Sequence, residues 1–170
     1  MNTFSYNANE YYTARGNNSL VSSRYNAYVT PTNFILPSKY KIKLDLMISS
    51  RSGNSGIIVS EDFNLSNSSH KSIEFCSWIS NSEPLGLAVR GSSESWVRGN
   101  TPLATNVWYT FELTYQGNHI WQGKVTNISD GTIMFNNSIT VPSLNPQYFS
   151  IGFSDNAMSV NIKNMEIEEL

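Results

Sequence analysis

Charged side chains are scarce in this chain. Asp, Glu, Lys and Arg make up 14% of its 170 residues, against about 25% in an average soluble domain. Thirteen acids outweigh eleven basic residues, which leaves a net charge of −2. Binding to nucleic acid needs a basic face, so this composition argues against such a partner. The densest basic stretch is Lys39, Lys41 and Lys43, whose spacing of two predicts one solvated strand face.

Cysteine and histidine are almost absent. Cys76 is the single cysteine, and His70 and His119 are the only histidines. One cysteine can form neither a disulfide within the chain nor a cysteine zinc site, and neither histidine has a partner at metal-ligand spacing. We therefore expect a buried, inert thiol and no cofactor. Structural calcium at Asp130 and Asp155 stays open, although Asx-turns explain these two residues more simply.

Long apolar runs are missing as well. No run approaches the 18 residues that suggest a membrane-spanning helix. The stretch that follows Met1 is polar as far as Tyr12 and contains no apolar core of a signal peptide. We predict an extracellular, cell-surface or virion location. Because no signal peptide is visible, the domain would reach it as part of a longer surface protein or by another route, such as assembly into a virus particle.

Asparagine, serine and threonine take the place of charge. The chain contains 21 Asn, 26 Ser and 11 Thr residues, so its surface is solvated by hydrogen-bonding groups rather than by ions. Such composition is typical of extracellular adhesive β-domains. A chain of this length can bury about 70% of its extended surface in one core, and we predict a single domain over residues 1–170.

Apolar and polar residues alternate along much of the sequence. Every second residue is apolar over residues 40–48, which predicts a strand with one buried and one wet face. The same alternation over residues 107–115, the turn formers Gln116-Gly117-Asn118 and a return strand over residues 119–126 predict a β-hairpin. Further strands are predicted at residues 25–30, 56–60, 72–80, 85–90, 95–99, 132–138, 148–153 and 159–168.

Many short strands separated by turn formers predict an all-β fold, with two antiparallel sheets packed as a sandwich. No stretch of ten or more residues shows the 3.6-residue period of a helix. In the last predicted strand the apolar phase changes, from Val160 and Ile162 to Met165 and Ile167. A β-bulge near Lys163-Asn164 would produce this change.

Three of these segments also carry a family resemblance. Residues 108–115, Trp-Tyr-Thr-Phe-Glu-Leu-Thr-Tyr, open with Trp after a polar loop and lead into Gly117-Asn118, while residues 148–153, Tyr-Phe-Ser-Ile-Gly-Phe, end in a Gly-aromatic pair. Residues 160–167, Val-Asn-Ile-Lys-Asn-Met-Glu-Ile, look like a closing strand that returns to the N-terminal part of a sandwich. Together they resemble the concanavalin A-like lectin/glucanase superfamily, which implies a jelly-roll sandwich but no particular ligand.

The resemblance implies several activities, since the family holds lectins, laminin-G-like domains, carbohydrate-binding modules and glucanases. The glucanase branch places paired carboxylates on one strand, and a retaining glycosidase needs its two carboxyl groups about 5–5.5 Å apart. Glu74 stands alone in its predicted strand, and the adjacent Glu61 and Asp62 would face opposite ways. We therefore predict that the chain is not an enzyme.

Strand phase also separates candidate binding residues from the core. In residues 72–98 one sheet face is predicted to be apolar and to carry Ile73, Phe75, Leu87 and Val97. The candidate binding residues lie on the opposite face. Aromatic rings pack on the C–H face of a sugar, and charged planar groups bind its hydroxyls. We therefore predict a shallow, exposed glycan groove, with Gly86 and Ala88 leaving room for the ligand, formed by Glu74, Trp78, Arg90, Trp96 and Arg98. Alternatively, Trp78 and Trp96 cover a sandwich end or lie under a loop.

The function predicted from the sequence is non-catalytic carbohydrate binding. The partner would be a glycan or cell-surface polysaccharide, and the domain would belong to an adhesin or to a virus or phage receptor-binding protein. The alternative is a structural or protein-interaction laminin-G-like domain of a larger extracellular protein. A glycoside hydrolase is a third, less favoured interpretation.

Overall fold

The computed structural model describes the backbone of residues 3–7, 11–15, 26–29, 36–50, 54–61, 71–77, 85–90, 95–154 and 159–170. Side chains are described for residues 36–49, 55–61, 71–77, 85–89, 95–151 and 160–170. Within these ranges every regular element is a β-strand. No helix long and apolar enough to cross a membrane is found among the described residues.

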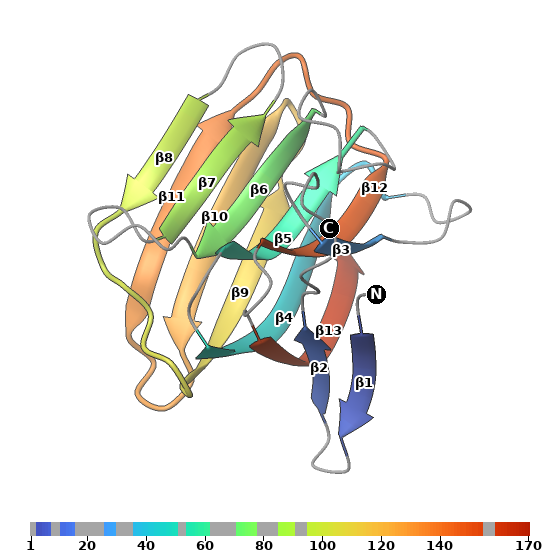
Figure 1. The fold of residues 1–170 in the computed structure, drawn as a ribbon. Helices are drawn as coiled ribbons and strands as arrows, with labels where there is room; N and C mark the ends of the chain where they lie inside the picture. Colours follow the sequence, from blue (N-terminus) through green and yellow to red (C-terminus); the bar gives the residue numbers. More distant parts are fainter. Residues whose placement is uncertain are drawn as a thin grey trace.

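The strands form two antiparallel sheets that are stacked as layers (Figure 1). The seven-stranded sheet has the order β1 (Thr3–Asn7), β2 (Tyr11–Arg15), β13 (Ser159–Glu169), β4 (Tyr40–Ser50), β9 (Trp108–Tyr115), β10 (Ile120–Asn127) and β11 (Ile133–Thr140). The six-stranded sheet has the order β3 (Asn26–Val29), β12 (Tyr148–Ser154), β5 (Asn54–Ser60), β6 (Ser72–Ser77), β7 (Leu85–Arg90) and β8 (Ser95–Gly99). The predicted two-sheet sandwich is confirmed.

Side chains from the facing surfaces of the two sheets form one apolar core. The ring of Phe75 in β6 contacts the opposite sheet, with its centroid 5.3 Å from that of Phe111 in β9 and 5.7 Å from that of Phe135 in β11. Gly123 in β10 leaves room for this ring, since a Cβ atom at that position would lie 2.7 Å from it. Three aromatic rings and one glycine therefore fix the spacing between the sheets, and burial of such rings is a major source of stability.

The last strand changes register at the predicted place. In β13, Lys163 pairs with Asp45 of β4, but the next paired residue, Glu166, faces Lys43, so two residues of β13 stand outside the ladder. Asn164 in this bulge has a φ of 50°, a left-handed conformation that Asn tolerates better than most residues. The bulge explains why the apolar phase of the strand changes.

The N-terminal strands were not predicted from the sequence. The stretch around β1 and β2 is polar, yet the two strands pair with each other and β2 pairs with β13. Pairing of β13 with β2 agrees with the expectation that the closing strand returns to the N-terminal part of the sandwich. The expected hairpin between β9 and β10 is also present, and Gly117, Asn118 and His119 all have positive φ in its turn.

Tyr40 and Trp121 bury polar atoms in the core. Their side chains are 1% and 0% exposed, and neither the Tyr40 hydroxyl nor the Trp121 indole N–H has a hydrogen-bond partner among the described residues. Burial raises the pKa of the Tyr40 hydroxyl, because the charged phenolate would lose its hydration. The nearby indole N–H of Trp121 favours the phenolate, although it lies outside good hydrogen-bond geometry, and offsets only part of this shift.

We expect the Tyr40→Phe variant to resist alkaline unfolding better than the wild-type chain. The pKa of Tyr40 is raised by folding, so its contribution to stability is complete below the unfolded pKa of about 10 and is lost as the pH rises above it. Above this pH, the free energy of unfolding of the wild type should fall up to about 1.4 kcal/mol per pH unit more steeply than that of the variant. Urea melts at several pH values between about 8 and 11 measure both slopes. Parallel slopes would contradict this role for Tyr40.

Candidate functional site

The strand register places three of the sequence-predicted residues, Glu74, Trp96 and Arg98, on one face of the six-stranded sheet. Glu74 in β6 is opposite Ala88 in β7, which is opposite Trp96 in β8. One pair along, Cys76, Gly86 and Arg98 form the next row. Adjacent residues such as Phe75 and Leu87 face the core. Glu74, Trp96 and Arg98 therefore lie on the face away from the core, as their parity predicts.

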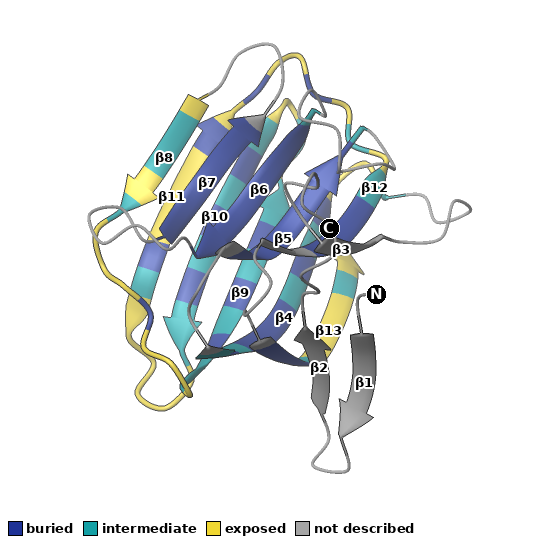
Figure 2. Cartoon of the chain, viewed as in Figure 1, coloured by how far each residue is buried: buried dark blue, intermediate teal, exposed yellow. Residues whose placement is uncertain are grey.

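The expected exposure is wrong for Glu74. Its side chain is 0% exposed, as are those of Cys76 and Ala88 beside it. In Figure 2 the described parts of β5, β6 and β7 are buried along their length, on both faces of the sheet. Alternation shows which face a side chain takes, but it does not show whether that face meets solvent. The small residues at 86 and 88 are packed rather than leaving an open groove.

Trp96 and Arg98 form a pair at the edge strand β8. The guanidinium carbon of Arg98 lies 4.5 Å from the centroid of the Trp96 ring, a cation–π contact. Trp96 also packs against the buried Cys76 and Ala88, so its ring covers part of the sheet. Arg90 pairs with Ser72 in the backbone ladder, but its side chain, like the whole of Trp78, lies outside the described residues.

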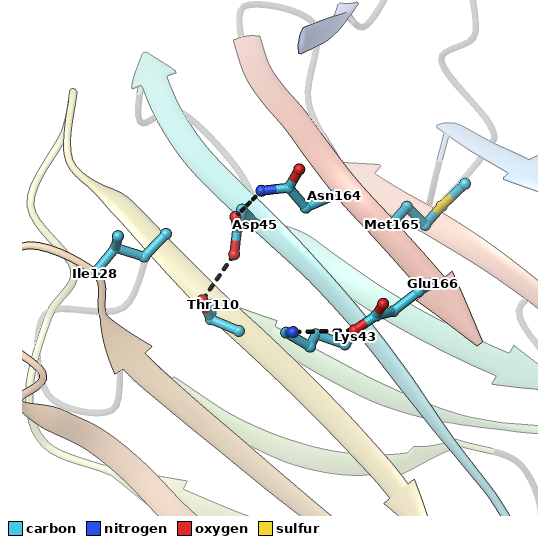
Figure 3. Close-up of a pocket in the computed structure, with 7 residues that line it drawn as sticks. All are labelled: Lys43, Asp45, Thr110, Ile128, Asn164, Met165 and Glu166. Carbon is cyan, nitrogen blue, oxygen red and sulfur yellow. Dashed lines mark hydrogen bonds and ion pairs between the residues drawn. The ribbon is translucent and has the colours of Figure 1, made fainter. Parts of the chain in front are cut away.

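A hollow of about 470 Å³ lies on the outer face of the seven-stranded sheet, where β13, β4 and β9 are neighbours (Figure 3). We call it the Asp45 hollow. Its described lining residues come from these three strands and from the loop after β10, and they are Lys43, Asp45, Thr110, Ile128, Asn164, Met165 and Glu166. None of them belongs to the cluster predicted from the sequence.

Asp45 is the most enclosed charged group of the hollow. It is 7% exposed, and its two carboxylate oxygens accept separate hydrogen bonds. Thr110 Oγ1 donates to Oδ1 at 2.7 Å, and Asn164 Nδ2 donates to Oδ2 at 2.7 Å (Figure 3). Each carboxylate oxygen has two acceptor sites, so Asp45 keeps acceptor capacity while its position is fixed from both sides.

Asn164 reaches Asp45 because of the bulge in β13. Lys163 occupies the ladder position opposite Asp45, and the two residues after it stand outside the pairing. The backbone at Asn164 turns to a φ of 50°, and its amide then points across the strand to the carboxylate. The bulge was predicted from the sequence, but the partner of the displaced asparagine was not.

The rim of the hollow combines an ion pair with apolar side chains. Lys43 Nζ lies 2.9 Å from Glu166 Oε1, and this hydrogen bond raises the pKa of Lys43 because it favours the ammonium form. Ile128 is 46% and Met165 52% exposed. The hollow therefore offers fixed polar groups beside exposed apolar surface.

Lys163 lies over the Trp108 ring on the same sheet. Its Nζ is 4.4 Å from the centroid of the Trp108 ring, a cation–π distance. Trp108 is half-buried and is opposite Met47 in β4. This packing indicates a structural role for Trp108 at the start of β9.

No group of three or more His, Cys, Asp or Glu side chains that could hold a metal ion occurs among the described residues. Asp130 Oδ1 accepts a hydrogen bond from the backbone N–H of Thr132 at 2.9 Å, and this bond lowers the pKa of Asp130. Asp130 is thus engaged in an Asx-turn. Asp155 lies outside the residues whose side chains are described, so calcium at this pair stays a prediction.

Comparison with known proteins identifies the fold. The sequence matches no family model and no curated protein. A legume lectin-like domain from Entamoeba histolytica is similar in structure, with a TM-score of 0.67 and 13% identity over 99% of this chain and 88% of that one. The exoplasmic/lumenal domain of VIP36, in a form bound to Ca²⁺ and Man3GlcNAc, has a TM-score of 0.65 and 10% identity over 100% and 84% of the two chains.

A carbohydrate-binding module from Bacillus subtilis, CBM66, is also similar, with a TM-score of 0.59 and 11% identity over 99% of this chain and 92% of that one. Identities this low show the fold alone. The similarity covers almost all of this chain and 84–92% of the others, and the shared fold is a two-sheet β-sandwich, as the sequence resemblance implied.

Proposed function

We propose that this chain is a non-catalytic glycan-binding domain and that its glycan binds in the Asp45 hollow. The observation that carries the proposal is the Asp45 carboxylate, held by Thr110 and Asn164 next to exposed apolar side chains. A sugar offers hydroxyl donors on its edges and C–H groups on its faces, and this arrangement suits both.

The geometry of the hollow supports this assignment. A hydroxyl pair on a sugar can donate to the remaining acceptor sites of Asp45, and charge-assisted hydrogen bonds of this kind are about twice as strong as neutral ones. Ile128 and Met165 can contact the apolar side of the ring. The volume of about 470 Å³ lies within the usual range of ligand sites, about 300–1,000 Å³.

The structural neighbours give the proposal further support. Three of the similar structures are described as a legume lectin-like domain, as a domain bound to Man3GlcNAc and as a carbohydrate-binding module. We further propose an extracellular setting, as part of a cell-surface adhesin or of a virus or phage receptor-binding protein. A surface rich in Asn, Ser and Thr suits that setting.

A glycan array with the purified domain tests the proposal. We expect signal on a restricted set of glycans, and competition by the free sugars of that set. Absence of signal on every glycan, with the protein shown to be folded by circular dichroism, would contradict glycan binding. It would favour the alternative of a structural or protein-interaction domain.

The cluster predicted from the sequence stays a second proposal for the place of contact. It contains Trp96 and Arg98 on β8 together with Glu74, Arg90 and Trp78. The contacts of Trp96 favour a structural role, since it packs against the buried Cys76 and Ala88 and its ring also contacts the Arg98 guanidinium. A sugar ring stacking on Trp96 would compete with Arg98.

We therefore expect Trp96→Ala to destabilise the domain without removing glycan binding. Loss of a half-buried ring should cost about 1–3 kcal/mol in the free energy of unfolding, less than the roughly 3–5 kcal/mol of a fully buried aromatic. Thermal melts and binding titrations of the same preparation measure the two effects. Unchanged stability together with lost binding would move the glycan site to the six-stranded sheet.

A further inference from the structure

The outer face of the seven-stranded sheet carries a ladder of alternating charges. Glu166, Lys43, Glu112 and Lys124 occupy successive positions across β13, β4, β9 and β10. The Lys43–Glu166 distance is 2.9 Å and the Lys124–Glu112 distance is 3.3 Å. Each ammonium in the ladder thus lies next to a carboxylate of a neighbouring strand.

Within the ladder, the lysine of the hollow is already paired with a carboxylate. Lys43 is the only cationic side chain among the described lining residues, and Glu166 already binds it. Lys163, which is opposite Asp45 in the ladder, does not line the hollow, and its Nζ lies 4.4 Å from the centroid of the Trp108 ring. No arginine, the residue best suited to bidentate recognition of a carboxylate, is among the described lining residues.

The most enclosed charge of the hollow is negative. Asp45 receives its hydrogen bonds from a hydroxyl and an amide, neither of which carries a positive charge. With Lys43 positive and Asp45 and Glu166 negative, the described lining carries a net charge of −1. A ligand carboxylate or sulfate beside Asp45 would meet a like charge in a partly buried site, where salt screens poorly.

We infer that the Asp45 hollow selects neutral glycans and rejects uronic, sialic and sulfated ones. This inference rests on the proposed function and names the ligand class of the same site. A sugar in the hollow can donate hydrogen bonds from its hydroxyl groups to Asp45 and can make apolar contacts with Ile128 and Met165. Neither kind of contact needs a charged ligand.

Matched probes test the inference on the wild-type domain. Methyl glycosides of glucose, galactose and mannose are compared with the corresponding methyl uronides, and neutral mannan and galactan with polygalacturonate and chondroitin sulfate. For each sugar that the domain binds, we expect the neutral compound to bind at least about tenfold more tightly than its acidic counterpart. A single like-charge contact can supply this difference in affinity. Raising the ionic strength from about 0.05 to 0.5 M should leave neutral binding almost unchanged, since no charge on the ligand is screened.

A charge variant gives a second, independent readout. Glu166→Gln removes the carboxylate that pairs with Lys43, so the Lys43 ammonium becomes available to a uronate carboxylate. The ratio of acidic to neutral binding should then rise about tenfold. Glu168→Gln breaks the adjacent pair with Lys41, where Nζ and Oε2 are 2.7 Å apart, and Glu168 does not line the hollow. This matched control should leave the ratio as in the wild type.

The outcomes separate the inference from the function on which it rests. A wild-type domain that binds acidic glycans as tightly as their neutral counterparts overturns the charge selection and leaves glycan binding in place. Equal ratios of acidic to neutral binding in the Glu166→Gln and Glu168→Gln variants overturn the charge selection as well. No binding to any probe or to any glycan of the array overturns the proposed function and the inference together.

Discussion

The Asp45→Asn variant should lose glycan binding by about 10- to 150-fold while keeping its fold. A hydrogen bond to a charged group contributes about 1.5–3 kcal/mol, which corresponds to that range of affinity. Asparagine has the same shape, and it can still accept from Thr110 and pair with the Asn164 amide once that amide rotates. Affinity therefore depends on the charge, and the melting temperature should change little. Titration with a glycan identified on the array, together with a thermal melt, measures both effects.

Glu112→Gln is the matched control for this change. Glu112 lies on the same sheet face, pairs with Lys124 at 3.3 Å and does not line the hollow. The same carboxylate-to-amide exchange there should leave the affinity almost unchanged. Full binding by Asp45→Asn, or an equal loss in both variants, would remove the hollow as the glycan site.

Gly56→Ala should destabilise the domain more than Trp96→Ala or any of the charge variants. A Cβ atom at Gly56 would lie 2.0 Å from the backbone oxygen of Phe75 and 2.7 Å from the Cα of Cys76. Backbone atoms of the paired strand β6 cannot rotate away, so β5 and β6 would have to separate in the middle of the six-stranded sheet. We expect a loss of more than about 3 kcal/mol in the free energy of unfolding, or no folded protein.

Gly131→Ala serves as the comparison. Gly131 has a φ of 74°, and a Cβ atom at this position would meet no atom within 4 Å, so the substitution causes conformational strain but no clash. It should cost only about 1–2 kcal/mol. Denaturant unfolding of both variants gives the difference. A similar cost at the two positions would show that β5 and β6 can adjust, contrary to their close packing at Gly56.

Local sequence pattern accounts for most of the fold. The strands β4 and β9 follow from strict alternation, because each has one face on the core and one in or near solvent. The strand β10 follows from the turn formers that precede it. The bulge in β13 follows from a change of apolar phase. The strands β1 and β2 were missed because their sequence is polar and because β2 pairs with β13, a partner far away in the sequence that local pattern does not reveal.

The site was harder to predict for a related reason. Parity placed Glu74 and Trp96 on the correct face of the sheet, but it carries no information on what covers that face, and Glu74 proved to be buried. In the sequence, Asp45 and Thr110 are ordinary polar positions of two wet strand faces. Only the register between β4, β9 and β13 brings them to Asn164. The phase slip at Lys163-Asn164 was the one local signal.

The position of β13 has a consequence for the order of folding. This strand lies between β2 and β4, and a contact such as that of Asn161 with Ser49 joins residues 112 positions apart in the sequence. Contacts of such long range make folding slow. Until β13 docks, β4 presents an unpaired edge on which Lys41 and Lys43 lack their carboxylate partners. Charged lysines on an open edge discourage pairing with other chains, so the same two side chains that later complete ion pairs protect the incomplete sheet from aggregation.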